Sequence, residues 1–244
     1  PKDIAGYQLV KTPDNKNGEM VVDLTTVTYE YRKNSNVIVK FIDENHNTEI
    51  ADQVSTKYKE GDTYTTTSKD IAGYKLTGQS DNTSGTVVRT NIEVTYKYKK
   101  ISDGVDVKYI DQATGAEIAD TEHKNGLEKD NYTTEPKEIP GYELVKTPTN
   151  KNGEMTVDKI TVVYEYRLLS DVTAKYIDEN TNQEIITAIT NTYKEGDAYK
   201  KKKKSFDEYT FTKVTGNTSG TVARENIVVT YYYKKIASGI EAKY

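Results

Sequence analysis

The stretch VDVKYIDQATGAEIAD, residues 105–120, holds the pattern that decides the fold. In VDVKYID apolar and polar side chains alternate, which is the period of a strand with one face in a core. QATG then supplies a short turn, in which Gly115 can take a positive φ, and AEIAD resumes as a second strand. The stretch therefore predicts a β-hairpin.

The same hairpin occurs twice more. VIVKFIDENHNTEIAD from Val37 and VTAKYIDENTNQEIIT from Val172 align with it without gaps, so one module recurs about every 67 or 68 residues. A second period of 135 residues, seen between Tyr7 and Tyr142, shows that two module types alternate. We predict full modules at 36–100, 104–167 and 171–235, the C-terminal half of a module at 1–33, and the start of a further one at 239–244. On this interpretation the sequence is an excerpt of a longer array.

Each module closes on an alternating strand: VTYEYR, VTYKYK, VVYEYR or VTYYYK. Its two tyrosines fall at i and i+2 and so lie on one face of the strand. In VTYKYK that face also carries Val94, which favours a core role for the tyrosines over a ligand-binding role. We expect about five strands in each module.

Composition also favours several small modules over one large domain. Only 34% of the residues are hydrophobic and 30% are charged, which leaves little material for a deep core. The absence of cysteine excludes disulfides, zinc-thiolate sites and thiol nucleophiles. A net charge of −4 gives no reason to expect nucleic acid as a partner, and no apolar run is long enough for membrane insertion.

The segments between modules, KNSN, ISDG, LLSD and IASG, read as short linkers. They contain no proline-rich or long Gly/Ser stretch, so successive modules should follow one another end to end with little bending. The sequence therefore predicts an elongated, monomeric rod.

The ordered set VxVKYID, EIAD, EGDxYTT, IPGYELVKTP, NxxG and VTYxY resembles the mucin-binding protein (MucBP) repeat of Gram-positive surface adhesins. The resemblance covers nearly the whole chain. It implies small β-grasp-like, ubiquitin-like modules, an extracellular location with cell-wall attachment through a part of the protein outside this sequence, and adhesion to host mucin or another glycoprotein.

Two departures from the repeated pattern bear on any ligand site. The third full module has FDEY at 206–209 in place of IAGY or IPGY, and the second has EKD at 128–130 in place of EGD. If either glycine lets a ligand approach the backbone, then not every module binds alike. If both are only turn residues, the changes are ordinary variation.

Few residues suggest chemistry. His46 and His123 occupy different module positions, and we expect both to be solvated surface residues and not metal ligands. Asp43, which recurs as Asp111 and Asp178, could belong to a calcium loop, but the middle copy DQATGAE has lost most of its oxygen ligands. Hairpin-turn aspartates are the better interpretation. We expect no enzyme, no cofactor and no metal.

Three features could carry recognition. The first is the set of tyrosines beside the Gly-Tyr turn, which could stack on sugar rings or could belong to the core: Tyr7, Tyr74, Tyr142 and Tyr209. The second is a lysine run that could attract sialylated or sulfated glycans, or could protect an edge strand from aggregation: Lys200, Lys201, Lys202, Lys203 and Lys204. The third is an exposed sheet edge that could add a mucin peptide as a further strand.

Two functions fit these features. The modules could be the adhesive part, each binding weakly, with the array supplying avidity. Alternatively, the array could be a structural stalk that projects a separate adhesive domain from the cell wall.

Overall fold

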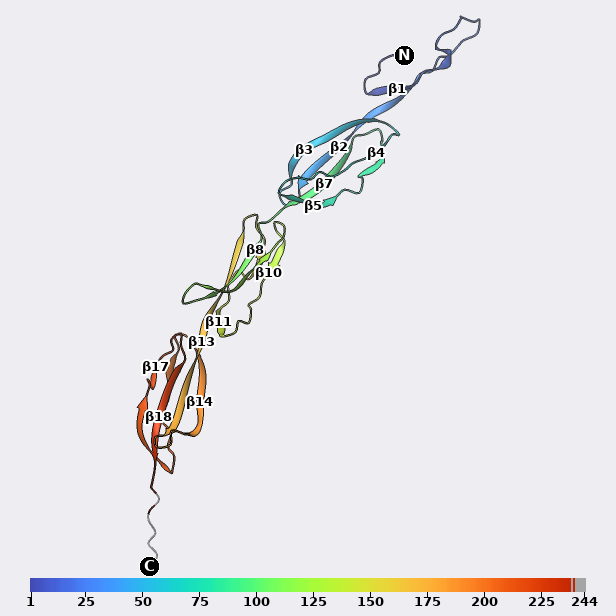
Figure 1. Cartoon of the computed structure of the whole chain (residues 1–244). Coiled ribbons are helices and arrows are strands. Elements are labelled where there is room, and N and C mark those ends of the chain that lie inside the picture. The colour runs from blue at the N-terminus through green and yellow to red at the C-terminus, as the bar shows by residue number, and fades with distance from the viewer. Residues whose placement is uncertain (238, 240–244) are drawn as a thin grey trace, which may run out of the picture. The chain divides into compact units, whose positions relative to one another are not determined.

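The protein is built almost entirely of β-strands. The computed structural model describes residues 1–237 and 239, and Figure 1 shows them as strands joined by turns. Apart from one 3₁₀ turn, η1 (Asp14–Lys16), every regular element of these residues is a strand. The prediction of a mainly β chain is confirmed. The predicted start of a further module, 239–244, lies outside the described residues except for Gly239.

The chain divides into two compact units. Unit 1 comprises Pro1–Gly104, Lys124–Asn131 and Glu154–Ile160. Its strands are β1 (Tyr7–Lys11), β2 (Glu30–Asp43), β3 (Thr48–Lys59), β4 (Thr63–Thr65), β5 (Tyr74–Gln79), β6 (Ser84–Thr86) and β7 (Ile92–Lys100). The main sheet has the order β1-β2-β7-β5, with β3 also paired to β2, and β4 pairs with β6 in a small second sheet.

A parallel pair of strands forms the centre of unit 1. β2 and β7 run side by side in parallel from Val37↔Ile92 to Asp43↔Tyr98. Alternate side chains of both strands point into one core, where the Phe41 and Tyr96 rings stack at 6.1 Å. The module's first and last strands therefore make most of its core.

Unit 2 contains the remaining strands apart from a few end residues. They are β8 (Val105–Asp111), β9 (Glu117–Lys124), β10 (Asn131–Thr133), β11 (Tyr142–Lys146), β12 (Asn152–Glu154), β13 (Ile160–Asp178), β14 (Glu184–Lys194), β15 (Ala198–Lys200), β16 (Tyr209–Thr215), β17 (Ser219–Thr221) and β18 (Ile227–Lys235). The main sheet has the order β16-β18-β13-β8-β9, and β11 and β14 also pair with β13. Two small sheets, β10-β12 and β15-β17, complete the set.

The core design of unit 1 is repeated in unit 2. The rings of Tyr109 and Tyr164 stack at 5.8 Å, and those of Tyr176 and Tyr231 stack at 5.5 Å. The closing-strand tyrosines of all three full modules are at most 3% exposed: Tyr96, Tyr98, Tyr164, Tyr166, Tyr231 and Tyr233. Their predicted core role is confirmed.

Two of the four segments predicted to be linkers are parts of strands, so the prediction is wrong for them. KNSN (33–36) lies inside β2, and LLSD (168–171) lies inside β13. No glycine or proline interrupts either segment, and alternating burial continues along both strands, so nothing ends the strand. ISDG (101–104) does separate β7 from β8, because Gly104 has a φ of +84°. Joints within the array are therefore of two kinds, one crossed by a continuous strand and one broken at a glycine.

The third module lacks a hydrogen bond that the first two modules share. In the first two modules a tyrosine hydroxyl lies 2.9 Å from a threonine hydroxyl, in the pairs Thr66–Tyr96 and Thr134–Tyr164. Lys201 replaces the threonine in the third module, and the buried hydroxyl of Tyr231 has no hydrogen-bond partner. A buried hydroxyl without a partner reduces stability.

We therefore expect Tyr164→Phe to destabilise its module by about 1 kcal/mol, because one hydrogen bond is lost. Tyr231→Phe should leave stability unchanged or raise it, since no hydrogen bond is lost with the hydroxyl. Native-state hydrogen exchange of β13 amides for the first variant and β18 amides for the second measures the opening free energy locally. Equal losses in the two variants would contradict this account of Tyr231.

Candidate functional site

The four tyrosines proposed as ligand contacts fall into two pairs. Tyr74 and Tyr209 are half-buried and pack against the apolar cores of their modules. Tyr7 and Tyr142, which are equivalent positions in the two-module period, line open hollows of about 400 and 750 Å³. Tyr142 shares its hollow with Pro136 and Pro140. Tyr142 is half-buried, as Tyr74 and Tyr209 are, and Tyr7 is 40% exposed.

Three of the five lysines of the run contact other groups of the third module. Lys201 is 8% exposed, its Nζ donates to Asn191 Oδ1 at 2.6 Å, and burial lowers its pKa. The ammonium of Lys203 lies 4.7 Å from the centre of the Phe211 ring. That of Lys204 lies 5.8 Å from the centre of a core tyrosine ring. Only Lys200 and Lys202 are left as exposed lysines for which no such contact is described.

The recurring aspartates are turn residues, as expected. Asp43, Asp111 and Asp178 are all buried, and each accepts a hydrogen bond at 2.9 Å from the backbone N–H two residues later. The fourth residue after each aspartate has a positive φ, as at Gly115. This leaves the second carboxylate oxygen of each aspartate free for another contact, and the contacts differ between modules.

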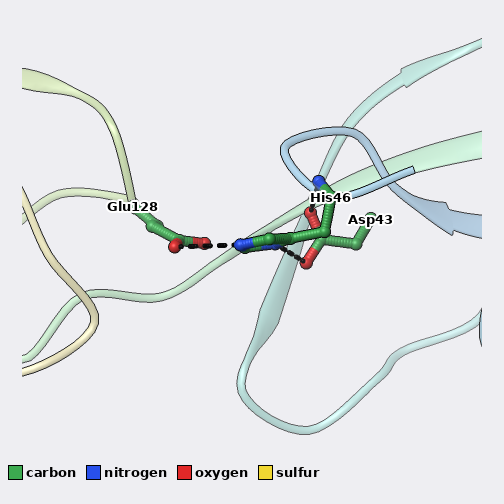
Figure 2. A group of neighbouring side chains, drawn as sticks. All are labelled: Asp43, His46 and Glu128. Atoms are coloured by element: carbon green, nitrogen blue, oxygen red, sulfur yellow. Dashed lines mark hydrogen bonds and ion pairs between the residues drawn. The ribbon is translucent and has the colours of Figure 1, made fainter. Parts of the chain in front are cut away.

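At the first of these turns, the structure brings Glu128, which is distant in the sequence, close to Asp43 and His46. His46 Nδ1 lies 3.0 Å from Asp43 Oδ2, and His46 Nε2 lies 3.5 Å from Glu128 Oε1. Figure 2 shows the imidazole lying between the two carboxylates, with Glu128 approaching from a separate loop. One ligand atom from each residue lies within 4.8 Å of the others. All three belong to unit 1.

Both histidines are exposed, as expected, but each lies beside acidic groups. The His46 side chain is 49% exposed and lies between the carboxylates of Asp43 and Glu128. His123 is 41% exposed, and its Nδ1 lies 2.6 Å from Asp106 Oδ1. The contact of His46 with Asp43 is local, at three residues along the chain, whereas Glu128 and Asp106 lie far from their histidines in the sequence, so no local pattern indicates those two contacts.

A substitution in the second module explains why Glu128 faces this turn. The equivalent glutamates of the first and third modules pair with an arginine of their own module, as in Arg89–Glu60 at 2.9 Å and Arg224–Glu195 at 2.6 Å. In the second module that arginine is replaced by Val157. Glu128 therefore has no such partner in its own module. Its backbone N–H donates to the carbonyl of Lys100, and this bond holds it beside the end of β7.

The equivalent turn in unit 2 has a different partner. The Arg224 guanidinium donates to Asp111 Oδ2 at 2.5 Å, so a carboxylate buried to 1% exposure is matched by a positive charge. The Arg224 guanidinium, by this hydrogen bond, is the largest cause that lowers the pKa of Asp111. The two kinds of joint thus differ in charge: a buried aspartate meets an arginine at one, and a histidine and a second carboxylate at the other.

The strands and their cores first define a class, which is a protein built of β-strands with parallel central pairs, β2–β7 in unit 1 and β13–β18 in unit 2. Four stretches of the chain, residues 1–32, 36–99, 104–167 and 171–234, match the model of the MucBP domain. The chain therefore belongs to the MucBP domain family, and the resemblance seen in the sequence is confirmed.

Relatives are found in Gram-positive bacteria. Internalin J of Listeria monocytogenes serotype 4b (strain F2365) is 36% identical over 247 residues, which are 96% of this chain and 26% of the relative. Muramidase-released protein of Streptococcus suis is 32% identical over 155 residues, 62% of this chain and 10% of the relative. The chain thus spans about a quarter of the length of internalin J.

Solved structures give a weaker match. The crystal structure of Mub-RV is 16% identical and covers 55% of this chain and 99% of its own, with a TM-score of 0.23. A score this low supports no argument about the fold. Among the described residues of our chain, no helix is long and apolar enough to span a membrane.

If Arg224 sets the charge state of Asp111, then Arg224→Gln should raise the pKa of Asp111 toward the ordinary value of about 3.9. A lowered folded-state pKa stabilises the fold above the unfolded-state pKa, and that stability is lost as pH falls through the folded-state value. The variant should therefore lose stability at neutral pH and show a weaker response to acid. Carboxyl ¹³C NMR titration measures the pKa directly.

Arg89→Gln is the matched control, because Arg89 pairs with Glu60 in unit 1 and does not contact Asp111. It should leave the Asp111 titration unchanged. An unchanged Asp111 pKa in Arg224→Gln would show that backbone hydrogen bonds alone hold the carboxyl ionised.

Proposed function

We propose that this chain is a non-catalytic repeat region of a Gram-positive cell-surface adhesin that binds mucin or a related host glycoprotein. Membership in the MucBP family and similarity to proteins named internalin support this proposal. Each module binds weakly, and several modules on one chain raise the avidity. The parent protein is extracellular and attached to the cell wall.

The proposed architecture is a monomeric rod of β-grasp-like modules at 36–100, 104–167 and 171–235, with a half module at 1–33. Two observations support it. The first is the mixed sheet with a parallel central pair in unit 1, and its counterpart in unit 2, where β13 and β18 are parallel. The second is the pair of long strands, β2 and β13, that each serve two successive modules. A shared strand limits bending at such a joint.

The hollow beside Tyr142 is the observation that carries the adhesive function. Its volume is about 750 Å³, and its lining combines the Tyr142 ring with Pro136 and Pro140. A tyrosine ring can cover the apolar face of a sugar while nearby polar groups bond the hydroxyls, and pockets of this size accommodate small ligands. Glu138 supplies such a polar group at the same hollow.

The stalk is the second candidate, and the continuous strands favour it. β13 alone extends over 19 residues and joins two modules without a break. An array with such joints gives length and stiffness whether or not its modules bind a ligand.

Binding to intact mucin, deglycosylated mucin and a glycan panel separates the two functions. The adhesive function predicts binding to intact mucin that falls at least about tenfold in Tyr142→Ala, because a stacking contact is worth more than 1 kcal/mol at a sugar-binding site. Absence of binding to all three ligands would leave the stalk. Binding that survives deglycosylation would point to capture of a peptide at a sheet edge.

Two controls accompany this experiment. Tyr209→Ala changes the equivalent tyrosine of the third module, which packs on a core, and should leave glycan affinity unchanged once folding is verified by circular dichroism. Changing only Lys200 and Lys202 to Thr leaves the bonded lysines in place. If this double variant removes the salt dependence of mucin binding, the lysine run contributes through its charge.

A further inference from the structure

The joint between the first and second full modules gathers negative charge without an arginine. Asp43 is 2% exposed and Glu128 is 13% exposed, so both carboxylates are largely withdrawn from water. Burying carboxylates is costly unless a positive charge or hydrogen bonds compensate. At the corresponding turn of unit 2, Arg224 provides that charge to Asp111. At this joint the side chain between the carboxylates is that of His46.

The neighbouring lysines of this joint are engaged by other groups. The Lys99 ammonium lies 3.1 Å from Asp130 Oδ1 and 3.9 Å from Glu44 Oε1. The Lys129 ammonium lies 3.5 Å from the backbone carbonyl of Asn45. These contacts direct both positive charges toward Glu44, Asp130 and a carbonyl.

The carboxylates of Asp43 and Glu128 lie on either side of the His46 ring, 3.0 Å from its Nδ1 and 3.5 Å from its Nε2. A cation of small radius would be stabilised among them.

We propose that Asp43, His46 and Glu128 form a binding site for a divalent transition-metal ion of the Zn²⁺ type, which fastens the first full module to the second. The site is independent of the proposed mucin binding. One imidazole nitrogen and two carboxylates are a ligand set that zinc accepts, with a fourth position left for water.

The geometry fits one ion after small side-chain movements. Zinc takes nitrogen and oxygen ligands at about 2.0–2.2 Å, so ligand atoms in a tetrahedral site are about 3.4 Å apart. The separation of His46 Nδ1 from Asp43 Oδ2 is 3.0 Å, and one ligand atom of each of the three residues falls within 4.8 Å of the others. The 49% exposure of the His46 side chain opens a path for the ion and its water.

The ligand types select the class of ion. Calcium takes six to eight oxygen ligands, and this cluster offers two carboxylates and a nitrogen. Imidazole nitrogen suits Zn²⁺, Ni²⁺ and Cu²⁺ and is seldom a ligand of calcium or magnesium. The other modules lack the nitrogen ligand, because Thr114 and Thr181 take the place of His46. The site therefore belongs to this joint and, in a longer array, to modules with the same sequence.

Zinc binding to the full chain, prepared without a polyhistidine tag, tests the proposal. Isothermal titration with ZnCl₂ at pH 7.5 should give one ion per chain, and His46→Gln and Glu128→Gln should each weaken binding at least about tenfold. His123→Gln is the matched control, since His123 also lies beside a carboxylate but outside this cluster. It should bind zinc as the unchanged chain does.

Hydrogen exchange gives a second measurement that reports on the joint itself. Zinc should slow exchange in Lys124–Asn131, where the N–H of Glu128 donates to the carbonyl of Lys100, in the unchanged chain and not in His46→Gln. A hundredfold excess of Ca²⁺ should not displace the zinc. Equal zinc binding by the unchanged chain and His46→Gln overturns the proposal. So does protection of this segment that depends on pH and not on zinc, which would assign the role to a protonated His46.

Discussion

The parallel pairing of a module's first and last strands, seen in β2–β7 and in β13–β18, is the constraint on which the rest of the structure depends. In unit 1 the register of β2 and β7 runs from Val37↔Ile92 to Asp43↔Tyr98. Because the two strands point the same way, the chain enters a module at one end and leaves it at the other. The hairpin turn that follows Asp43 consequently lies beside the exit of the chain, where the next module begins.

This register also explains why the buried aspartates became joint residues. The turn hydrogen bonds use one oxygen of each aspartate, and the chain exit brings residues of the following module close to the second oxygen. At Asp111 that residue is Arg224. At Asp43 the second oxygen contacts His46 of the same module, and Glu128 of the following module contacts the other nitrogen of the His46 ring. The replacement of an arginine by Val157 releases Glu128 for its role. The two-module period of the sequence is therefore also an alternation of charge at the joints.

The joints differ in backbone as well as in charge. β2 and β13 pass from one module into the next as single strands, whereas Gly104 ends the strand path between β7 and β8. A continuous strand resists bending through its ladder of backbone hydrogen bonds. A joint broken by glycine lacks that ladder and depends more on side-chain contacts. The cluster of Asp43, His46 and Glu128 lies at a joint of the second kind, where a bound ion would add the most.

The sequence by itself determined the modules. Alternation in VDVKYID and in the tyrosine strands predicted the hairpins and the buried faces, since a strand's side chains alternate with a period of two. Positive-φ residues such as Gly115 marked the turns for the same local reason. Only the tertiary structure decided the joints. KNSN and LLSD have linker-like composition but continue strands, because neighbouring strands were available to pair with them. The meeting of His46 with Glu128 depends on a strand register and a chain exit that no local pattern encodes.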